Sequence, residues 1–179
     1  MKKYYLVLLI ITAVLLASSC SPGMNPDDLD FDKSFSFTAE LQYSGRGSVA
    51  QFMRTAPGEW NGTLVEPFAL QGVEIAYSPL EMSVSYAGFA VNYGADSPPD
   101  INITAFVMIR VLESAFNSED AGVTSGRDWI EITGIYDGDT YVLRLDKEGS
   151  PISLSVPNRQ LKVVFSEVTT AQFNAAPPR

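Results

Sequence analysis

The sequence contains no histidine among its 179 residues and only one cysteine. The lack of histidine removes the commonest general base, the usual Ser-His-Asp and Cys-His arrangements, and most zinc sites. The single cysteine, Cys20, has no second cysteine in the chain with which to form a disulfide. We therefore expect a protein that is not an enzyme, has no catalytic residues, and binds neither cofactor nor metal.

Positive charge is also scarce, since 12 Lys and Arg residues stand against 21 Asp and Glu residues. Nucleic acid is excluded as a partner, because phosphate binding requires a basic face. The segment Gly45-Arg46-Gly47 is a short turn without the helix that must follow a phosphate-binding loop. A glycosidase needs two carboxylates on opposite sides of the bond that it cleaves, and no pattern in the sequence places two together. We therefore interpret the candidates as solvated surface groups; they are Glu66, Glu74, Asp128 and Glu131.

The N-terminus has the layout of a secretory signal. Two lysines precede an apolar run from Leu6 to Leu16, which is shorter than the roughly 20 residues that a membrane-spanning helix needs. Small residues, Ala17-Ser18-Ser19, then lead into Cys20. This ending resembles the lipobox of bacterial lipoproteins, although Ala17 stands where leucine is commonest.

The lipobox resemblance implies that residues 1–19 are removed and that the Cys20 thiol receives a diacylglycerol. The partner would then be a membrane, either the cell membrane or the outer membrane, with the domain on its extracytoplasmic side. The alternative is an ordinary secreted protein with a free cysteine near its end. In an exported chain a single cysteine has no disulfide partner, so we expect its thiol to have another role. Lipidation is such a role.

Residues 20–33 are predicted to form a flexible, self-repelling tether, because they combine Pro22, Gly23 and Pro26 with an acidic cluster. A calcium site is the alternative interpretation of that cluster. The segment lacks the glycine and the terminal glutamate of an EF-hand loop. The acidic residues concerned are Asp27, Asp28, Asp30 and Asp32.

Residues 34–168 are predicted to form one mainly β domain, followed by a disordered tail over residues 169–179. Apolar and polar residues alternate from Phe35 to Tyr43, which indicates a strand with one buried face. The turn Ser44–Gly47 leads into a hairpin partner at Ser48–Thr55. Tight turns between the remaining segments favour an antiparallel meander. The further strands are expected at Trp60–Val65, Gly72–Tyr77, Met82–Tyr86, Asp128–Tyr136, Thr140–Asp146, Ile152–Val156 and Leu161–Glu167.

One segment, Ile101–Phe116, interrupts the strands and is predicted to be a helix. It is apolar over most of its circumference, which indicates a buried helix, and Asp100 is a plausible N-cap. A β-branched strand remains the alternative for part of it. The expected fold class is therefore mainly β (α+β), with a curved antiparallel sheet, or half-barrel, wrapped around one inserted apolar helix near residues 101–116.

From about Phe35 to Val168 the order of elements resembles the carriers and receptors of the lipoprotein-localisation system and the lipid-binding lipoproteins of mycobacteria. That order is an opening hairpin, further strands, an inserted apolar helix and closing strands. The resemblance implies a hydrophobic cavity that shelters acyl chains of a lipid or of another lipoprotein. Segments that carry it locally are Phe52-Met53-Arg54, Pro57-Gly58-Glu59-Trp60, Val65-Glu66-Pro67, Leu143-Arg144-Leu145-Asp146 and Gly149-Ser150-Pro151-Ile152.

Thirteen apolar residues are candidates for the cavity wall, and Arg110 is a candidate for binding a lipid headgroup. The alternative for the thirteen is a filled core, because packed cores and lined cavities use the same residue types. The alternative for Arg110 is a paired or snorkelling side chain. With a filled core, the protein would be a non-catalytic interaction or structural lipoprotein of the envelope. The wall candidates are Phe35, Phe37, Leu41, Phe52, Trp60, Leu64, Ile75, Tyr77, Val84, Phe106, Ile109, Leu143 and Phe165.

Overall fold

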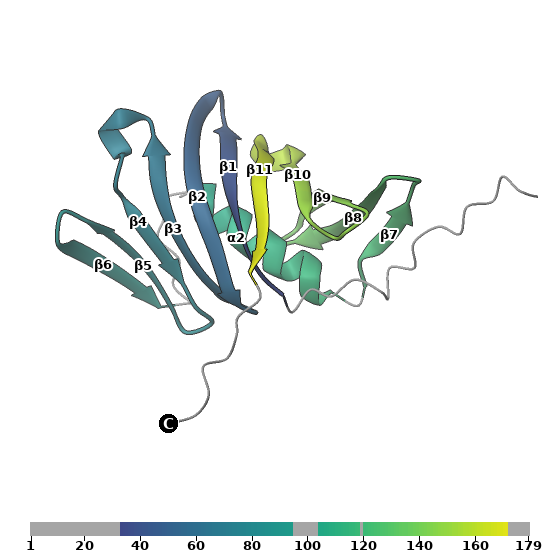
Figure 1. Cartoon of the computed structure of the whole chain (residues 1–179), viewed down its shortest axis with the longest axis horizontal. Coiled ribbons are helices and arrows are strands. Elements are labelled where there is room, and N and C mark those ends of the chain that lie inside the picture. Colours follow the sequence, from purple (N-terminus) through teal and green to yellow (C-terminus); the bar gives the residue numbers. More distant parts are fainter. Residues whose placement is uncertain (1–32, 95–103, 119, 172–179) are drawn as a thin grey trace, which may run out of the picture.

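The computed structural model describes residues 33–94, 104–118 and 120–171. They form one curved, unclosed antiparallel sheet of 11 strands and one α-helix (Figure 1). This confirms the expected mainly β class. The elements are β1 (Ser34–Tyr43), β2 (Arg46–Ala56), β3 (Glu59–Glu66), η2 (Phe68–Leu70), β4 (Glu74–Tyr77), β5 (Glu81–Tyr86), β6 (Phe89–Gly94), α2 (Thr104–Asn117), β7 (Gly122–Ser125), β8 (Trp129–Tyr136), β9 (Asp139–Asp146), β10 (Pro151–Val156), η3 (Pro157–Arg159) and β11 (Leu161–Ala171).

The sheet consists of two meanders joined along their inner strands. Its strand order is β6-β5-β4-β3-β2-β1-β11-β10-β9-β8-β7, so the chain runs outward from β1 to one edge and later returns inward from the opposite edge. The strand β1 pairs with β11, with Leu41 opposite Val163. The chain between the two edge strands contains α2, which lies behind the central strands in Figure 1. The connection therefore crosses one face of the sheet.

Alternation along the strands decides which face is buried. In β1 the residues Phe35, Phe37, Ala39 and Leu41 are buried, while the residues between them are more exposed. Side chains directly opposite one another in an antiparallel pair point to the same face, and Phe37 faces Phe52 in β2. The predicted opening hairpin is confirmed, and β2 begins two residues earlier than expected, at Arg46.

Two-residue turns with positive φ at both central positions close three of the hairpins. They are Ser44-Gly45, Ala87-Gly88 and Asp137-Gly138, with φ between 47° and 85°. This backbone matches the right-handed twist of the flanking strands, and glycine at the second position adopts it without steric cost. Asp137-Gly138 joins β8 to β9, where the sequence predicts a hairpin.

Two strands in the structure were not expected from the sequence. Both are edge strands: β6 follows the Ala87-Gly88 turn, and β7 is only four residues long. Every residue of β7 is exposed, and only Tyr93 of β6 is partly buried. Because these two strands bury little of either face, their sequences show little apolar alternation, and pairing with β5 and β8 decides their conformation.

The helix prediction is confirmed from Thr104, where the described part of the segment begins, and the helix ends at Asn117. Residues 101–103 and the expected N-cap Asp100 lie outside the described residues. Eight of the 14 helical residues are buried, and they include Met108, Ile109, Val111 and Leu112. The seven apolar ones among these eight belong to the same core cluster as the buried strand residues, and α2 contacts β1, β8 and β9.

The final strand extends to Ala171, so the first three residues of the expected disordered tail are in the sheet. Thr169, Thr170 and Ala171 pair with Ser36, Phe35 and Ser34. The polar residues of this stretch show no apolar alternation that would predict a strand. The stretch is held in the sheet by hydrogen bonds to β1 rather than by burial of its side chains. The expected signal segment, Cys20, the acidic tether up to Asp32 and residues 172–179 lie outside the described residues.

Candidate functional site

An apolar pocket lies between the sheet and the start of α2. Its volume is about 410 Å³, and strands β1 to β5, the β3–β4 connection and the helix all contribute to its wall. None of the lining residues in the described part of the chain carries a charge. They are Leu41, Ser48, Ala50, Leu64, Leu70, Val73, Ile75, Val84, Thr104 and Ala105.

Small side chains explain why the interior is hollow here. Ser48 and Ala50 of β2 line the pocket, and Thr104 and Ala105 do so from the helix. Their side chains fill little of the space between the two layers. Farther along the same strands the facing residues are large, as Phe52 and Trp60 show, and they are 2% and 1% exposed. The pocket is therefore confined to the end of the interior where α2 begins.

The structure places four of the thirteen wall candidates in the pocket: Leu41, Leu64, Ile75 and Val84. The other nine belong to the packed core or lie against it, and Tyr77 is the only one of the nine that is not fully buried. Tight aromatic packing accounts for much of that core, with Phe37 and Phe165 ring centroids 4.8 Å apart. The nine are Phe35, Phe37, Phe52, Trp60, Tyr77, Phe106, Ile109, Leu143 and Phe165.

Six lining residues were not among the sequence candidates. Ala50 and Ser48 share the buried face of β2 with Phe52, so strand alternation could have found them. Leu70 and Val73 lie in the β3–β4 connection, which no periodic pattern marks. Thr104 and Ala105 are the first two residues of α2 as the structure describes it.

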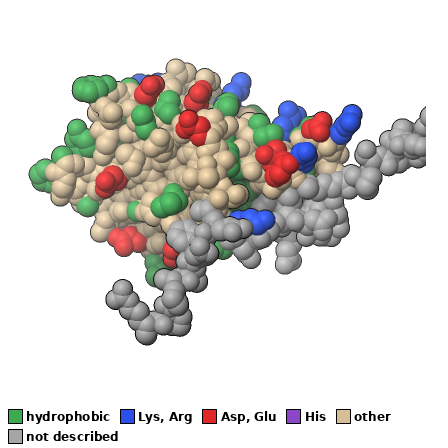
Figure 2. Space-filling model, viewed as in Figure 1, with side chains coloured by type: hydrophobic (Ala, Val, Ile, Leu, Met, Phe, Trp, Pro, Cys, Tyr) green, Lys and Arg blue, Asp and Glu red, His purple; other side chains and the backbone are tan. Residues whose placement is uncertain are grey.

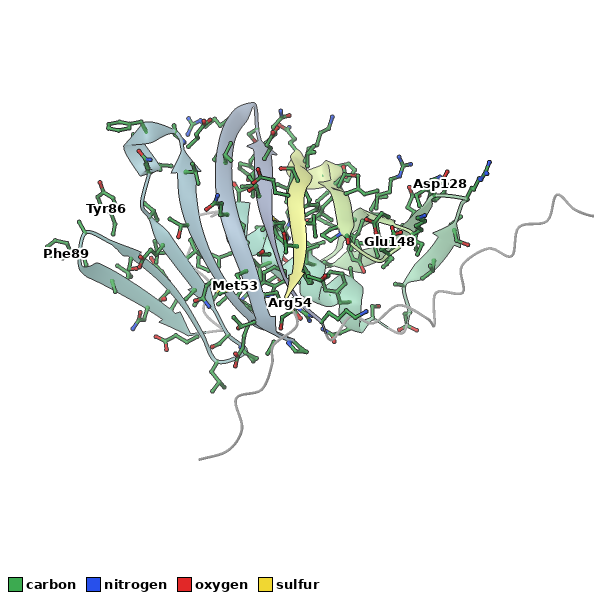
Figure 3. The ribbon with its side chains drawn as sticks, in the orientation of Figure 1. Met53, Arg54, Tyr86, Phe89, Asp128 and Glu148 are labelled. Atoms are coloured by element: carbon green, nitrogen blue, oxygen red, sulfur yellow. The ribbon has the colours of Figure 1, made fainter. Side chains whose placement is uncertain are left out.

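Exposed apolar side chains lie at the end of the sheet that contains the pocket. The short helix η2 carries Leu70, which lines the pocket, and Phe68, which is 89% exposed. The β5–β6 hairpin presents Tyr86 and Phe89, which lie at the outer edge of the molecule in Figure 3. Val91, paired with the lining residue Val84, is also exposed. Apolar surface therefore continues from the pocket onto the neighbouring strands.

At the other end of the helix, a buried ion pair joins α2 to β2. Arg54 Nε donates to Glu113 Oε1 at 2.8 Å, and Arg54 Nη2 donates to Glu113 Oε2 at 3.2 Å. Trp60 Nε1 donates to the same Glu113 Oε1 at 2.6 Å, and Asn117 Nδ2 donates to the Glu113 backbone carbonyl at 2.8 Å. Two charge-assisted bonds in parallel fix both distance and orientation. This cluster positions the helix on the sheet.

Aromatic rings surround the Arg54 guanidinium. Its Cζ lies 5.3 Å from the ring centroid of Phe116 and 5.9 Å from those of Phe35 and Trp60. A cation over an aromatic face is attracted by the ring quadrupole, more strongly where water is excluded. In the described residues, every buried side-chain nitrogen and oxygen has a hydrogen-bond partner. The charge of Arg54 is thus compensated within the core.

Arg110, the headgroup candidate, lies between two tyrosines rather than in the pocket wall. Its Nη1 donates to the Tyr136 hydroxyl at 3.5 Å, and it also bonds the Tyr77 hydroxyl. Burial raises the pKa of the Tyr77 phenol, and the nearby Arg110 charge partly opposes that rise. Because Tyr77 is on β4 and Tyr136 on β8, Arg110 connects the two halves of the sheet.

A second, polar hollow occupies the opposite face of the sheet, the face seen in Figure 2. It has a volume of about 800 Å³ and crosses the strands from β11 to β5. Hydroxyl, amide and carboxylate groups dominate its lining. Thr38 donates to Glu167 at 2.8 Å and Ser85 donates to Glu74 at 3.0 Å. Such an open, polar surface suits water rather than an acyl chain.

The four carboxylates considered for catalysis do not gather in the structure as an acid pair. Glu131 accepts from Arg144 at 3.1 Å, and Glu74 accepts from Ser85. Neither Glu66 nor Asp128 contributes to the apolar pocket or to the polar hollow. In the described ranges, no group of three Asp, Glu or other ligating residues could hold a metal ion. No helix of that part of the chain is long and apolar enough to cross a membrane.

Comparisons with known proteins find similarity in structure alone. No family model matches the sequence, and no curated protein does so. An uncharacterized conserved protein from Thermus thermophilus superposes with a TM-score of 0.54 at 9% identity, covering 80% of this chain and 82% of that one. This similarity shows a shared fold.

Two further solved structures resemble the chain more distantly. A LolA superfamily protein from Nitrosomonas europaea has a TM-score of 0.39 at 9% identity, covering 80% of this chain and 89% of its own. A DUF1329 family protein from Desulfovibrio piger has a TM-score of 0.41 at 8% identity, covering 84% and 90%. Function must therefore be argued from this chain's own residues.

Proposed function

We propose that the protein is a membrane-anchored extracytoplasmic lipoprotein that binds a hydrophobic ligand, a lipid or a lipoprotein acyl chain. In this proposal the sheet wraps around α2 as a half-barrel, and the ligand enters the pocket between them. The observation that carries the proposal is the uncharged pocket of about 410 Å³ bounded by Leu41, Leu64 and Ile75 on the sheet and Ala105 on the helix.

The pocket has the properties that apolar ligands require. Its volume falls within the range of roughly 300–1,000 Å³ typical of small-molecule sites. Each methylene transferred from water into such a wall gains about 0.8 kcal/mol, without the need for directed hydrogen bonds. Leu70 lines the pocket while remaining 44% exposed, so its side chain connects the interior with solvent.

The membrane anchor in this proposal is lipid on Cys20. It rests on the apolar run Leu6–Leu16 and on the small residues Ala17-Ser18-Ser19 before the cysteine. Two acyl chains on one cysteine would hold the protein stably, whereas a single chain gives only marginal binding. A net charge of −9 gives the protein little attraction for anionic headgroups, so the acyl chains would provide the attachment.

Labelling with radioactive palmitate in a bacterial host tests the anchor. The wild-type chain is expected to incorporate the label and to fractionate with membranes after proteolytic maturation. The Cys20→Ala variant is expected to lose the label and to remain uncleaved. Equal labelling of the two chains would contradict lipidation at Cys20.

Native mass spectrometry of the full-length Cys20→Ala chain tests ligand binding, because any lipid then detected is non-covalent. The chain is extracted in CHAPS, which has no acyl chain. We expect a bound lipid mass, and after delipidation an increase in N-phenyl-1-naphthylamine fluorescence. Leu64→Glu should abolish the increase, because it places a charge in the pocket, whereas the matched control Val123→Glu on exposed β7 should retain it.

An apo mass without a fluorescence response would contradict the binding proposal. It would favour the alternative, an interaction or structural lipoprotein whose interior serves only to hold the fold together. The aromatic core around Phe37 and Trp60 is compatible with that alternative, and the pocket is not needed for it.

A further inference from the structure

On β2 the described lining of the apolar pocket consists of Ser48 and Ala50 and does not extend to Phe52. Beyond Ala50 on β2 the next core-facing residue is Phe52, and a Cβ atom added to the neighbouring Gly62 would lie 2.3 Å from the Phe52 ring. Met108 and Ile109 close the interior from the helix, and both are 0% exposed. Packing at this density leaves no room for a ligand to continue past Phe52.

The size of the pocket limits how much ligand it holds. A methylene group takes up about the same space as a water molecule in the liquid, roughly 30 Å³. The pocket of about 410 Å³ therefore accommodates about 14 such groups. That is the length of one ordinary acyl chain, and the two chains of a phospholipid would need about twice the volume.

The lining also restricts the ligand's head. None of the ten lining residues that the structure describes is charged, and the side-chain polar groups among these ten are the hydroxyls of Ser48 and Thr104. A carboxylate at the mouth would receive no counter-charge from these residues, in a chain whose net charge is −9. The net negative charge of the chain repels an anionic head, and the described lining supplies no cation to offset that repulsion. A neutral or zwitterionic head avoids this repulsion.

We infer that the pocket is selective for single-chain lipids with a neutral or zwitterionic head, such as a lysophospholipid, and that it holds about 14 carbons of the chain. This inference rests on the proposed function. It adds the ligand class and a limit on chain length. The limit follows from the pocket volume and from the packed Phe52 beyond Ala50, and the head preference follows from the uncharged described lining.

Competition by lipid class tests the inference. The delipidated full-length Cys20→Ala chain in CHAPS is mixed with equimolar palmitoyl-lysophosphatidylcholine, palmitate and dipalmitoyl-phosphatidylcholine, and the retained lipid is counted by native mass spectrometry. One lysolipid per chain is expected, at least tenfold more abundant than either competitor.

Chain length is tested with lysophosphatidylcholines of 10, 12, 14, 16 and 18 carbons, measured by displacement of N-phenyl-1-naphthylamine. Affinity should rise about fourfold per methylene up to about 14 carbons and then level off. Thr104→Phe, at a partly exposed lining position, should shift that plateau to shorter chains. The control Ala90→Phe, on exposed β6 and outside the pocket, should leave it unchanged.

Each result is decisive. If no lipid binds, both the proposed function and this inference fail. If the two-chain lipid is retained as well as the lysolipid, the single-chain inference fails while the proposed function stands. Palmitate retained equally would overturn the head preference. An affinity that climbs steadily to 18 carbons, or a plateau that Thr104→Phe does not move, would overturn the length limit.

Discussion

Glu113 on α2 and Arg54 on β2 lie 59 positions apart in the sequence, and their side chains form a bidentate ion pair inside the core. Arg54 is 1% exposed and Glu113 is 9% exposed. Figure 3 labels Arg54 at the lower end of β2, near the middle of the sheet. Trp60 also donates to Glu113. Together the three side chains hold the helix against the sheet, at the end of the interior opposite to the pocket.

Removing one charge of this pair should be far more damaging than removing both. Glu113→Ala leaves Arg54 buried and uncompensated, which costs about 3–5 kcal/mol of unfolding free energy. The double variant Arg54→Met/Glu113→Leu should cost less than the sum of the two single changes. Urea unfolding followed by circular dichroism measures these differences. As a control, Glu131→Ala breaks the exposed pair with Arg144 and should cost at most about 1 kcal/mol.

Gly62 should not tolerate a side chain while Phe52 is present. A Cβ atom at position 62 would lie 2.3 Å from two carbons of the Phe52 ring, so Gly62→Ala should cost roughly 1–3 kcal/mol through overpacking. Gly47→Ala is the matched control, because a Cβ there meets nothing within 4 Å. Thermal unfolding of the variants gives the comparison. A double variant, Gly62→Ala/Phe52→Leu, that is no better than Gly62→Ala alone would contradict the steric cause.

The Ala87-Gly88 turn holds an alanine where glycine or asparagine is usual. Ala87 has a φ of 51°, a left-handed conformation that costs about 1–2 kcal/mol for a residue with a Cβ atom. Ala87→Gly should therefore increase the urea midpoint slightly, the gain being reduced by the greater freedom of glycine in the unfolded chain. Gly88→Ala, at φ 85°, should have the opposite effect. Equal midpoints for all three chains would show that the turn stores no strain.

Asp139 should make stability depend on acid pH. Hydrogen bonds from Arg159 and Asn158 hold the pKa of the Asp139 carboxyl below its ordinary value of 3.8, and Arg159 Nε donates to it at 2.6 Å. A depressed pKa in the folded state adds stability above the unfolded value, and this contribution disappears as the pH falls through the folded pKa. In Asp139→Asn the free energy of unfolding should therefore fall less steeply as the pH drops below about 4. Urea unfolding at a series of acid pH values measures this, and the same pH dependence in the variant and the wild type would argue against the contribution.

The amino-acid pattern predicts well which face of each strand is buried. It predicts poorly where the apolar pocket lies. Alternation in Phe35–Tyr43 identifies the buried face, because that face follows from chain geometry alone. Whether a buried residue lines a void depends on the sizes of the residues opposite it. Ala50 and Ala105 come from distant segments, so their meeting at the pocket cannot be deduced from either segment alone.

The Arg54–Glu113 pair has a signature in the sequence, namely two opposite charges at core-facing positions. Arg54 stands two residues after Phe52, on the buried face of its strand. Glu113 stands four residues after Ile109, on a helix that is otherwise apolar on that side. Two opposite charges at core-facing positions indicate partners, since an unpaired buried charge is too costly to retain. The edge strands β6 and β7 gave no such signal.

The pairing of β1 with β11 has a consequence for how the chain is made. Ser34 opposes Ala171, so the central ladder joins segments separated by nearly the whole domain. The pairing of β1 with β11, which joins the two meanders, cannot form until the last strand has emerged from the ribosome. Domains dominated by such distant contacts fold slowly. The half-built sheet from β1 to β6 would meanwhile present an unpaired central edge, an opportunity for a chaperone and a hazard without one.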